Sequence, residues 1–263
     1  MSIGSILRKS GWLLLPVVLV AAGAAWYLLD PGFRTAVQSP EAFLRMPQDE
    51  FERRVRDYLL NNPAVIVEAV QGFEARRRAA DQTEAQAVLA ARADEVFRDS
   101  ASPVGGNPQG DVTVVEFFDY NCPYCRRVAP VLAEAEAADP QLRIVYKEFP
   151  ILGPNSVFAA KAALAAQRQE RYIAFHHALM QVRGTVDEAA VLAAAGEVGL
   201  DVARLKTDMQ DTAIQTAIDR NTALARDLRI NGTPGFVIGS EILRGATDLE
   251  VLHGLIRKAR EAQ

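Results

Sequence analysis

Two cysteines are the residues of this chain that most directly offer chemistry. The 263-residue sequence contains Cys122 and Cys125, separated by Pro123 and Tyr124, and no other cysteine. A thiolate attacks disulfides, and a second thiol two residues away can attack the mixed disulfide that results. The spacing therefore predicts a redox pair, with Cys122 as the nucleophile and Cys125 as the resolving thiol.

The segments around the pair indicate how Cys122 is activated. Residues 112–118 predict a buried strand, and residues 123–138 predict a helix with proline at its first position. Cys122 then lies at a helix N-terminus, where unpaired backbone N–H groups and the helix dipole favour a thiolate. Residues 142–149 predict a second strand, so the strand–helix–strand unit implies a parallel pair.

Other uses of a C-x-x-C pair are weighed against redox chemistry. A zinc site needs two more ligands, and the chain offers only His176, His177 and His253 besides the cysteines. A structural disulfide across so short a segment adds little stability. Capture of Cu(I) by the two thiolates stays open, because Cu(I) prefers soft ligands. For a redox protein we predict no metal and no cofactor other than the Cys122–Cys125 disulfide.

A proline lies at the entrance of a later strand. Gly232-Thr233-Pro234-Gly235 precedes a predicted strand at 235–238, and proline is excluded from the interior of a sheet, so Pro234 should form a turn. A cis Pro234 would hold the Thr233 backbone beside the cysteines, where it could pair with an extended substrate. An ordinary loop proline is the alternative.

Glu116 interrupts the apolar run of the first strand. Alternation puts it on the same face as Val112 and Val114, which predicts that it points inward. Burial of a carboxyl group is costly and raises its pKa, so Glu116 could exchange a proton with Cys125 through water. A solvent-facing glutamate is the alternative, and Lys147 is a candidate charge partner.

The remaining pattern is helical and then returns to strands. Residues 154–230 predict a helical block, followed by strands at 235–238 and 242–244 and a final helix. Thr185 with Glu188, and Thr247 with Glu250, predict capping boxes that open two helices. The order βαβ, helical block, ββα predicts an α/β fold.

The N-terminal residues predict export. Residues 12–29 form an uncharged apolar run, preceded by Arg8 and Lys9, which is long enough to cross a membrane with the N-terminus in the cytoplasm. Small residues at 22–24 would also suit a signal peptidase. We expect residues 1–30 to be a signal anchor or a cleaved signal peptide, and both remain open.

Between the predicted export segment and the first predicted strand, the sequence predicts a linker followed by helices. Residues 31–47 predict a linker, and residues 48–99 predict helices with a narrow apolar stripe, as an oligomerisation stalk or a solvated spacer. Residues 100–110 are rich in turn formers and mark a boundary. The net charge of −4, with both signs mixed along the chain, argues against nucleic-acid binding.

Three stretches together resemble the DsbA family of extracytoplasmic thiol–disulfide oxidoreductases. They are VVEFFDYNCPYC (114–125), YKEFPILG (146–153) and NGTPGFVIG (231–239), and the resemblance spans about residues 105–262. It implies a thioredoxin fold with a helical domain inserted at about 154–230. It also implies a cis Pro234 after Thr233, and a buried acidic residue at Glu116.

The stretch DEFERRVRDYLLNNPAVIVEAV (49–70) is similar to the N-terminal region of ScsC-type (suppressor of copper sensitivity) proteins. In some of these relatives the region assembles trimers and the protein isomerises disulfides. The similarity favours a stalk over a spacer for residues 48–99, and suggests a homo-oligomer that could be a trimer.

Two positions depart from the strongly oxidising DsbA, which has histidine at the place of Tyr124 and valine at the place of Thr233. Without a histidine donor near the sulfur, the Cys122–Cys125 disulfide should be less oxidising. Oxidase and isomerase activity both stay open. The resemblance implies exported proteins as substrates, a membrane redox partner that reoxidises or reduces the pair, and a location on the periplasmic side of the bacterial inner membrane.

Overall fold

A computed structural model describes residues 47–263. It divides into two compact units, the first ending at Glu74 and the second comprising Ala75–Gln263. The predicted signal segment 1–30 and residues 31–46 of the predicted linker lie outside the described residues. Within the described part of the chain, no helix has the length and apolar character needed to span a membrane.

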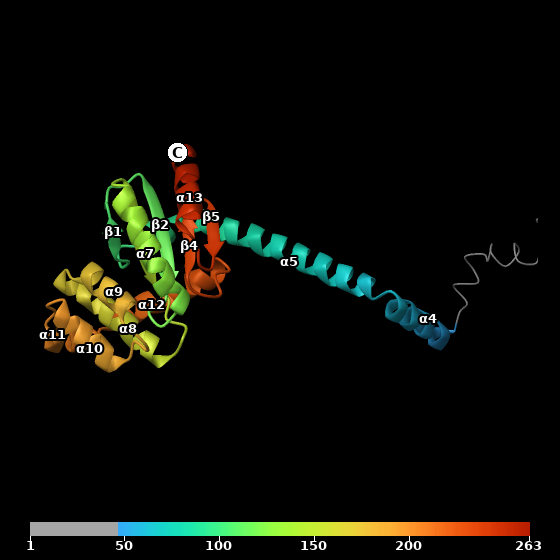
Figure 1. The fold of residues 1–263 in the computed structure, drawn as a ribbon, viewed down its shortest axis with the longest axis horizontal. Coiled ribbons are helices and arrows are strands. Elements are labelled where there is room, and N and C mark those ends of the chain that lie inside the picture. The colour runs from blue at the N-terminus through green and yellow to red at the C-terminus, as the bar shows by residue number, and fades with distance from the viewer. Residues whose placement is uncertain (1–46) are drawn as a thin grey trace, which may run out of the picture. The chain divides into compact units, whose positions relative to one another are not determined.

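The second unit is built on a five-stranded mixed sheet in the order β1-β3-β2-β4-β5 (Figure 1). Strands β2 (Val112–Phe118) and β3 (Leu142–Glu148) are parallel and are connected through helix α7 (Pro123–Ala138). Strand β4 (Gly235–Ile238) pairs antiparallel with β2, and β5 (Glu241–Arg244) pairs antiparallel with β4. This is the thioredoxin-like α/β fold that the resemblance described above implies.

Strand β1 (Val104–Gly106) was not predicted and lies in a segment assigned to turns. It pairs antiparallel with β3, with Val104 opposite Val145 and Gly105 opposite Ile144. A three-residue strand with two glycines has no alternation that a pattern could detect. Its pairing with the edge of β3 is a tertiary contact, which local sequence does not encode.

The two faces of the sheet form two cores. On one face Val114 and Phe118 of β2 pack with α7 and with α13 (Leu249–Glu261). On the other face Val115 and Phe117 pack with Leu224 of helix α12 (Thr212–Asp227). Alternate residues of β2 are therefore buried on opposite faces, which explains its nearly continuous apolar sequence.

A helical insertion lies between β3 and β4, in agreement with the predicted block at 154–230. It contains α8 (Pro154–Ala166), the 3₁₀ turn η1 (Gln167–Gln169), α9 (Tyr172–Gln181), α10 (Glu188–Glu197), α11 (Val202–Asp208) and α12. Helices α8 to α11 gather at one end of the sheet (Figure 1).

The two predicted capping boxes are wrong by one or two residues. Helix α10 begins after Asp187, whose carboxylate accepts a hydrogen bond from the backbone of Ala190, 2.9 Å away. Asp248 caps α13 in the same way through the backbone N–H of Val251, also at 2.9 Å. Aspartate is as good an N-cap as serine and better than threonine, so the carboxylates next to each helix take the position.

The helices that precede the sheet are α4 (Gln48–Asn61), α5 (Pro63–Ala91) and α6 (Ala93–Phe97), with the predicted break before Pro63. Leu89 of α5 and Val96 of α6 are buried in the core on the second face of the sheet. The predicted 48–99 segment is therefore divided, since its residues from Ala75 onward belong to the second unit.

Candidate active site

Cys122 lies in the turn between the end of β2 and the start of α7. Its backbone N–H donates to the carbonyl of Asp119 at 3.0 Å, and its own carbonyl accepts from the N–H of Arg126 at 3.2 Å. Cys122 has extended backbone angles and is the N-cap residue, with Pro123 at the first helical position. The sulfur-bearing residue is thus at a helix N-terminus, and both cysteines are free thiols.

The Thr233–Pro234 peptide bond is cis and lies beside Cys122. The Cys122 Sγ donates a hydrogen bond to the Thr233 carbonyl oxygen at 3.2 Å. The next residue must be small: a Cβ on Gly235 would lie 2.5 Å from Cγ2 of Ile230. A glycine here therefore allows β4 to begin directly after the proline, with Thr233 held against the cysteine.

Cys125 lies one turn into α7 and is buried in the core. Burial raises the pKa of this thiol strongly, and the nearby charge of Glu116 raises it further. Cys125 is therefore held as a neutral thiol, which needs a proton acceptor before it can attack.

Glu116 is buried on the same face of the sheet as Val114 and Phe118, as alternation predicts. Its Oε1 has no hydrogen-bond partner, and burial raises the pKa of Glu116 to about 8. A carboxyl group that titrates near neutral pH can both accept and donate a proton.

Lys147 is not the charge partner of Glu116. It lies opposite Phe117 in the sheet and so faces the other side. Its ammonium group donates to the carbonyl of Glu95 at 2.7 Å and pairs with the carboxylate of Asp99 at 3.4 Å. Lys147 thus ties β3 to α6 and to the segment that follows it.

A second buried carboxyl group, Glu148, was missed by the sequence analysis. Its Oε1 accepts hydrogen bonds from the hydroxyls of Tyr120 at 3.0 Å and Tyr172 at 2.8 Å, and Tyr120 also bonds to Nδ1 of His176 at 3.1 Å. Burial raises the pKa of Glu148 and lowers that of His176 to about 3, so both side chains are neutral. Alternation within 142–149 places Glu148 on the face of Ile144 and Tyr146, which is the signal that could have indicated it.

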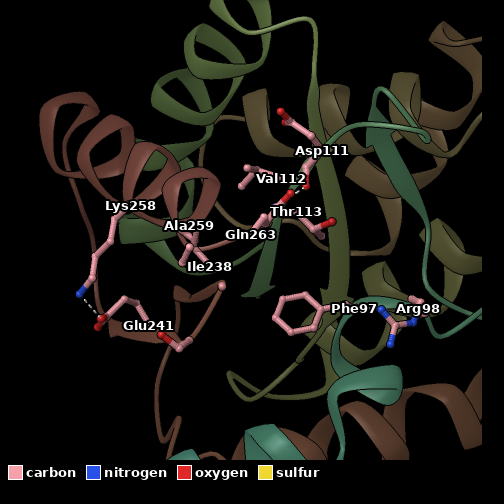
Figure 2. A pocket seen from close by; sticks show the side chains of 13 residues that line it. Phe97, Arg98, Asp111, Val112, Thr113, Ile238, Glu241, Lys258, Ala259 and Gln263 are labelled. Atoms are coloured by element: carbon pink, nitrogen blue, oxygen red, sulfur yellow. Dashed lines mark hydrogen bonds and ion pairs between the residues drawn. The ribbon is translucent and has the colours of Figure 1, made fainter.

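A surface pocket of about 400 Å³ lies at the opposite end of the sheet, between the start of β2, the end of β4 and α13 (Figure 2). Its lining includes Asp111, Glu241 and Lys258, and the last two form an ion pair at 2.6 Å. None of the predicted site residues lines it. Among residues 47–263, no group of three or more metal-binding side chains is arranged to hold an ion.

The fold and the cysteine pair together define a thioredoxin-like protein with the parts that thiol–disulfide exchange needs. The Cys122 thiol, at the N-terminus of α7, lies against the carbonyl of Thr233, the residue before the cis proline. The second thiol, Cys125, lies one helical turn away. The chain belongs to the DSBA-like thioredoxin domain family, whose model matches residues 113–257. Residues 48–80 match the copper resistance protein ScsC N-terminal domain.

Several solved structures and curated proteins are similar to the chain. A thioredoxin-like oxidoreductase from Silicibacter pomeroyi is 49% identical with a TM-score of 0.64, covering 65% of this chain and 98% of its own. Proteus mirabilis ScsC in a transitional conformation is 31% identical with a TM-score of 0.63, covering 82% and 98%. The thiol:disulfide interchange protein DsbA of Bordetella parapertussis is 28% identical over 172 residues, covering 60% and 82%.

Some curated relatives are much longer proteins. The chain spans 24% of the length of the Na(+)/H(+) antiporter NhaA 1 of Salinispora arenicola, with 28% identity over 158 residues.

Proposed function

We propose that this protein is an extracytoplasmic thiol–disulfide oxidoreductase that forms or isomerises disulfide bonds in exported proteins. The observation that carries the proposal is the position of Cys122 Sγ, at the N-terminus of α7 and 3.2 Å from the Thr233 carbonyl oxygen. A helix N-terminus favours the thiolate form that exchange requires.

In the oxidising direction, a substrate thiolate attacks Cys122 Sγ of the Cys122–Cys125 disulfide. The bond between the cysteines breaks, a mixed disulfide forms, and Cys125 leaves as a thiolate that takes a proton from Glu116. A second substrate thiolate then attacks the substrate sulfur and releases Cys122. The substrate gains one disulfide and the protein pair gains two electrons; Cys125 carries the proton that came from Glu116, and Cys122 is released as a thiolate.

In the isomerising direction, the Cys122 thiolate attacks a substrate disulfide and frees one substrate thiolate. Another substrate thiolate later attacks the substrate sulfur that is bound to Cys122. Cys122 leaves as the thiolate that it was at the start, so there is no net transfer of electrons. When this step stalls, Glu116 accepts the proton of Cys125, and Cys125 attacks Cys122 Sγ. That reaction restores the protein disulfide and releases a reduced substrate.

The Thr233 backbone is the proposed binding element for the substrate chain. Its carbonyl accepts the Cys122 S–H in the dithiol form. Formation of a mixed disulfide removes that S–H donor and frees the carbonyl for a backbone N–H of an extended substrate. Substrate pairing is then strongest when the covalent intermediate exists.

Partners and location follow from the exported position that the N-terminal residues predict. We propose that residues 12–29 anchor or export the protein, so that the cysteines act on the periplasmic side of the bacterial inner membrane. A membrane redox partner then reoxidises the pair for an oxidase, or keeps it reduced for an isomerase.

The first unit is proposed as an oligomerisation element. Its described helices expose large apolar side chains on α4 and the start of α5, including Tyr58, Ile66, Val70 and Phe73. Exposed apolar surface of this extent is typical of a protein interface. Self-association through these residues, as a trimer or another homo-oligomer, would place several cysteine pairs in one assembly.

Refolding of RNase tests the activity. With reduced RNase or scrambled RNase as substrate, the wild type should accelerate recovery of RNase activity, and Cys122→Ser should abolish the effect. No acceleration by the wild type, or full activity in Cys122→Ser, would contradict the proposal. Alkylation trapping in cells distinguishes the direction, because an oxidised pair indicates an oxidase and a reduced pair an isomerase.

A second candidate is a Cu(I)-binding protein, suggested by the match of residues 48–80 to a domain named for copper resistance. That segment has no cysteine, so Cu(I) would need the Cys122 and Cys125 thiolates. Stoichiometric copper binding without turnover of RNase would favour this candidate.

A further inference from the structure

Two polar side chains, Asn121 and Arg126, directly flank the cysteine segment, residues 122–125. Both are half-buried. Both bond to the backbone of one loop, residues 182–187, which connects α9 to α10 in the helical insertion. The segment that carries the cysteines is therefore attached to the insertion at each of its two ends.

On the N-terminal side, Asn121 pairs with the loop through both groups of its amide. Its Oδ1 accepts a hydrogen bond from the Val186 N–H at 2.8 Å, and its Nδ2 donates to the Val186 carbonyl at 3.2 Å. The Nδ2 also donates to the hydroxyl of buried Ser156 in α8 at 3.3 Å. The Asn121 backbone N–H is held in turn by Oδ1 of buried Asp119 at 2.8 Å. The position of the residue before Cys122 is thus fixed to the loop and to α8.

On the C-terminal side, the Arg126 guanidinium joins three backbone carbonyls. Its Nη1 donates to the carbonyls of Val182 at 3.0 Å and Gly184 at 2.7 Å, and its Nε donates to the carbonyl of Tyr120 at 2.9 Å. The last bond closes residues 120–126, which contain both cysteines, into a ring. Hydrogen bonds from a charged donor are stronger than those between neutral groups, so the guanidinium is an effective brace.

We propose that Asn121 and Arg126 are positioning residues that clamp the cysteine segment to residues 182–187, and that this clamp sets the stability of the Cys122–Cys125 disulfide. The inference rests on the proposed function, in which that disulfide forms and breaks. Two thiols held in a fixed geometry have a high effective concentration toward each other, and that concentration falls when either sulfur can move. Loss of the clamp should therefore make the disulfide less stable relative to the dithiol.

The geometric role of Arg126 is separable from its charge because the two act in opposite directions. A nearby cation favours a thiolate, so loss of the charge alone disfavours the reduced protein and makes the disulfide more stable. Arg127 is the matched control for charge. Its exposed guanidinium lies 4.8 Å from the centre of the Tyr124 ring, and none of the hydrogen bonds among the described residues joins it to residues 182–187.

The loop offers a second way to disturb the clamp while leaving Asn121 and Arg126 unchanged. Gly184, whose carbonyl accepts from Arg126, has a φ of +83°, a left-handed conformation that favours glycine. Gly184→Val therefore strains the loop backbone. Gly199, between α10 and α11, has a φ of +75°, and a Cβ at either glycine would meet no atom within 4 Å. Gly199→Val thus applies a similar strain to the insertion away from the clamp.

Equilibration of the full-length protein with a glutathione redox buffer provides the test. Oxidised glutathione takes two electrons from the Cys122–Cys125 dithiol, the protein disulfide forms, and the two thiol protons go to the two reduced glutathione molecules that are released. Alkylation and mass spectrometry give the equilibrium constant for this reaction. We expect Arg126→Gln, Asn121→Ala and Gly184→Val each to lower the constant by about 10-fold, which corresponds to about 30 mV.

The controls Arg127→Gln and Gly199→Val should not lower the constant. An unchanged or raised constant in Arg126→Gln contradicts the clamp. An equal decrease in Gly199→Val and Gly184→Val also contradicts it, because general strain in the insertion would then set the constant. Gly184→Val leaves the cysteine segment intact, so it decides the question if Arg126→Gln does not fold. A wild-type pair that does not exchange with glutathione would overturn the proposed function itself.

Discussion

Glu116 and Cys125 share a buried environment in which both groups favour their neutral forms. Burial raises the pKa of both, and the Glu116 charge contributes to the shift at Cys125. The carboxyl group can therefore give a proton to Cys125 when it leaves, and take that proton when it attacks. Neither a hydrogen bond nor a cation competes for Glu116 Oε1 in the described structure.

Glu116→Gln should slow the resolving step, because the amide cannot accept the Cys125 proton. We expect a decrease of about 100-fold in the rate at which Cys125 clears a mixed disulfide on Cys122 at pH 7. Quenched-flow alkylation and mass spectrometry measure this rate. Glu134→Gln, at an exposed position of α7, is the matched control, and equal rates in the two variants would contradict the role of Glu116.

Glu116 also predicts a pH dependence of stability. The unfolded chain loses this proton near pH 4.5, whereas the folded protein keeps it until about pH 8. Between these values the unfolded state binds fewer protons, so the free energy of unfolding falls as pH rises and levels off above pH 8. Relative to Glu116→Gln, the reduced wild type should lose up to about 5 kcal/mol across this window. Urea unfolding at each pH measures the free energy of unfolding of both proteins. If that free energy changed with pH in the same way in the wild type and in Glu116→Gln, the carboxyl group would not be buried.

At the residue scale, the spacing of the cysteines and the alternation of apolar residues were sufficient for predictions that depend on a single strand or a single helix. They identified the cysteine pair and the inward direction of Glu116. The assignment of Lys147 as the partner of Glu116 was wrong because the register between two strands decides which of their residues lie on the same face of the sheet. The sequence of one strand does not determine that register. Asp119 was missed for the same reason, since its carboxylate accepts hydrogen bonds from the backbone of Ile151 and Leu152, which follow β3.

The helical insertion is joined to the sheet by a polar cluster at Glu148. The cluster takes its hydroxyls from two different elements, the turn after β2 and helix α9. Asn221 of α12 adds a hydrogen bond to the Glu148 backbone carbonyl at 3.2 Å. The insertion is therefore held by polar contacts as well as by the apolar core.

Tyr172→Phe should weaken this attachment while the ring still packs. Loss of the hydroxyl leaves Glu148 with one fewer donor in a buried site, for an expected destabilisation of about 1–3 kcal/mol. Urea unfolding measures the change, with the exposed Tyr58→Phe as control. A change as small as that of the control would contradict a structural role for the hydroxyl.

The presence and order of most helices and strands were predictable because helical and alternating apolar patterns extend over many residues. Strand β1 and the identities of the N-caps were not, because each depends on a few residues whose partners are set by tertiary structure. The Glu148 cluster combines three segments that are distant in sequence, and no local pattern contains it.

At the scale of the whole molecule, the proposed oligomerisation role of the first unit would bring several cysteine pairs into one assembly. Its exposed apolar residues lie on α4 and the first part of α5, and residues from Ala75 onward belong to the second unit. A deletion that tests the stalk should therefore end at residue 74, since a longer one would remove Leu89 and Val96 from a core.

Ile66→Ser/Val70→Ser/Phe73→Ser should convert the oligomer to a monomer. Each substitution removes apolar area worth about 1.5–3 kcal/mol per side chain if the interface buries it fully. Sedimentation measures the mass, and Val251→Ser is the control for an exposed apolar residue outside the stalk. A wild type that is already monomeric would contradict the stalk proposal. The apolar pattern of residues 48–99 alone could not decide between a stalk and a solvated spacer.

The central claim is that Cys122 is the sulfur that exchanges with substrate. It is tested most directly by incubating Cys125→Ser with scrambled RNase and mapping the trapped adduct by mass spectrometry. The account predicts a mixed disulfide at Cys122 that accumulates in Cys125→Ser and is cleared in the wild type. No adduct at Cys122, or an equal yield at Cys125 in Cys122→Ser, would contradict it.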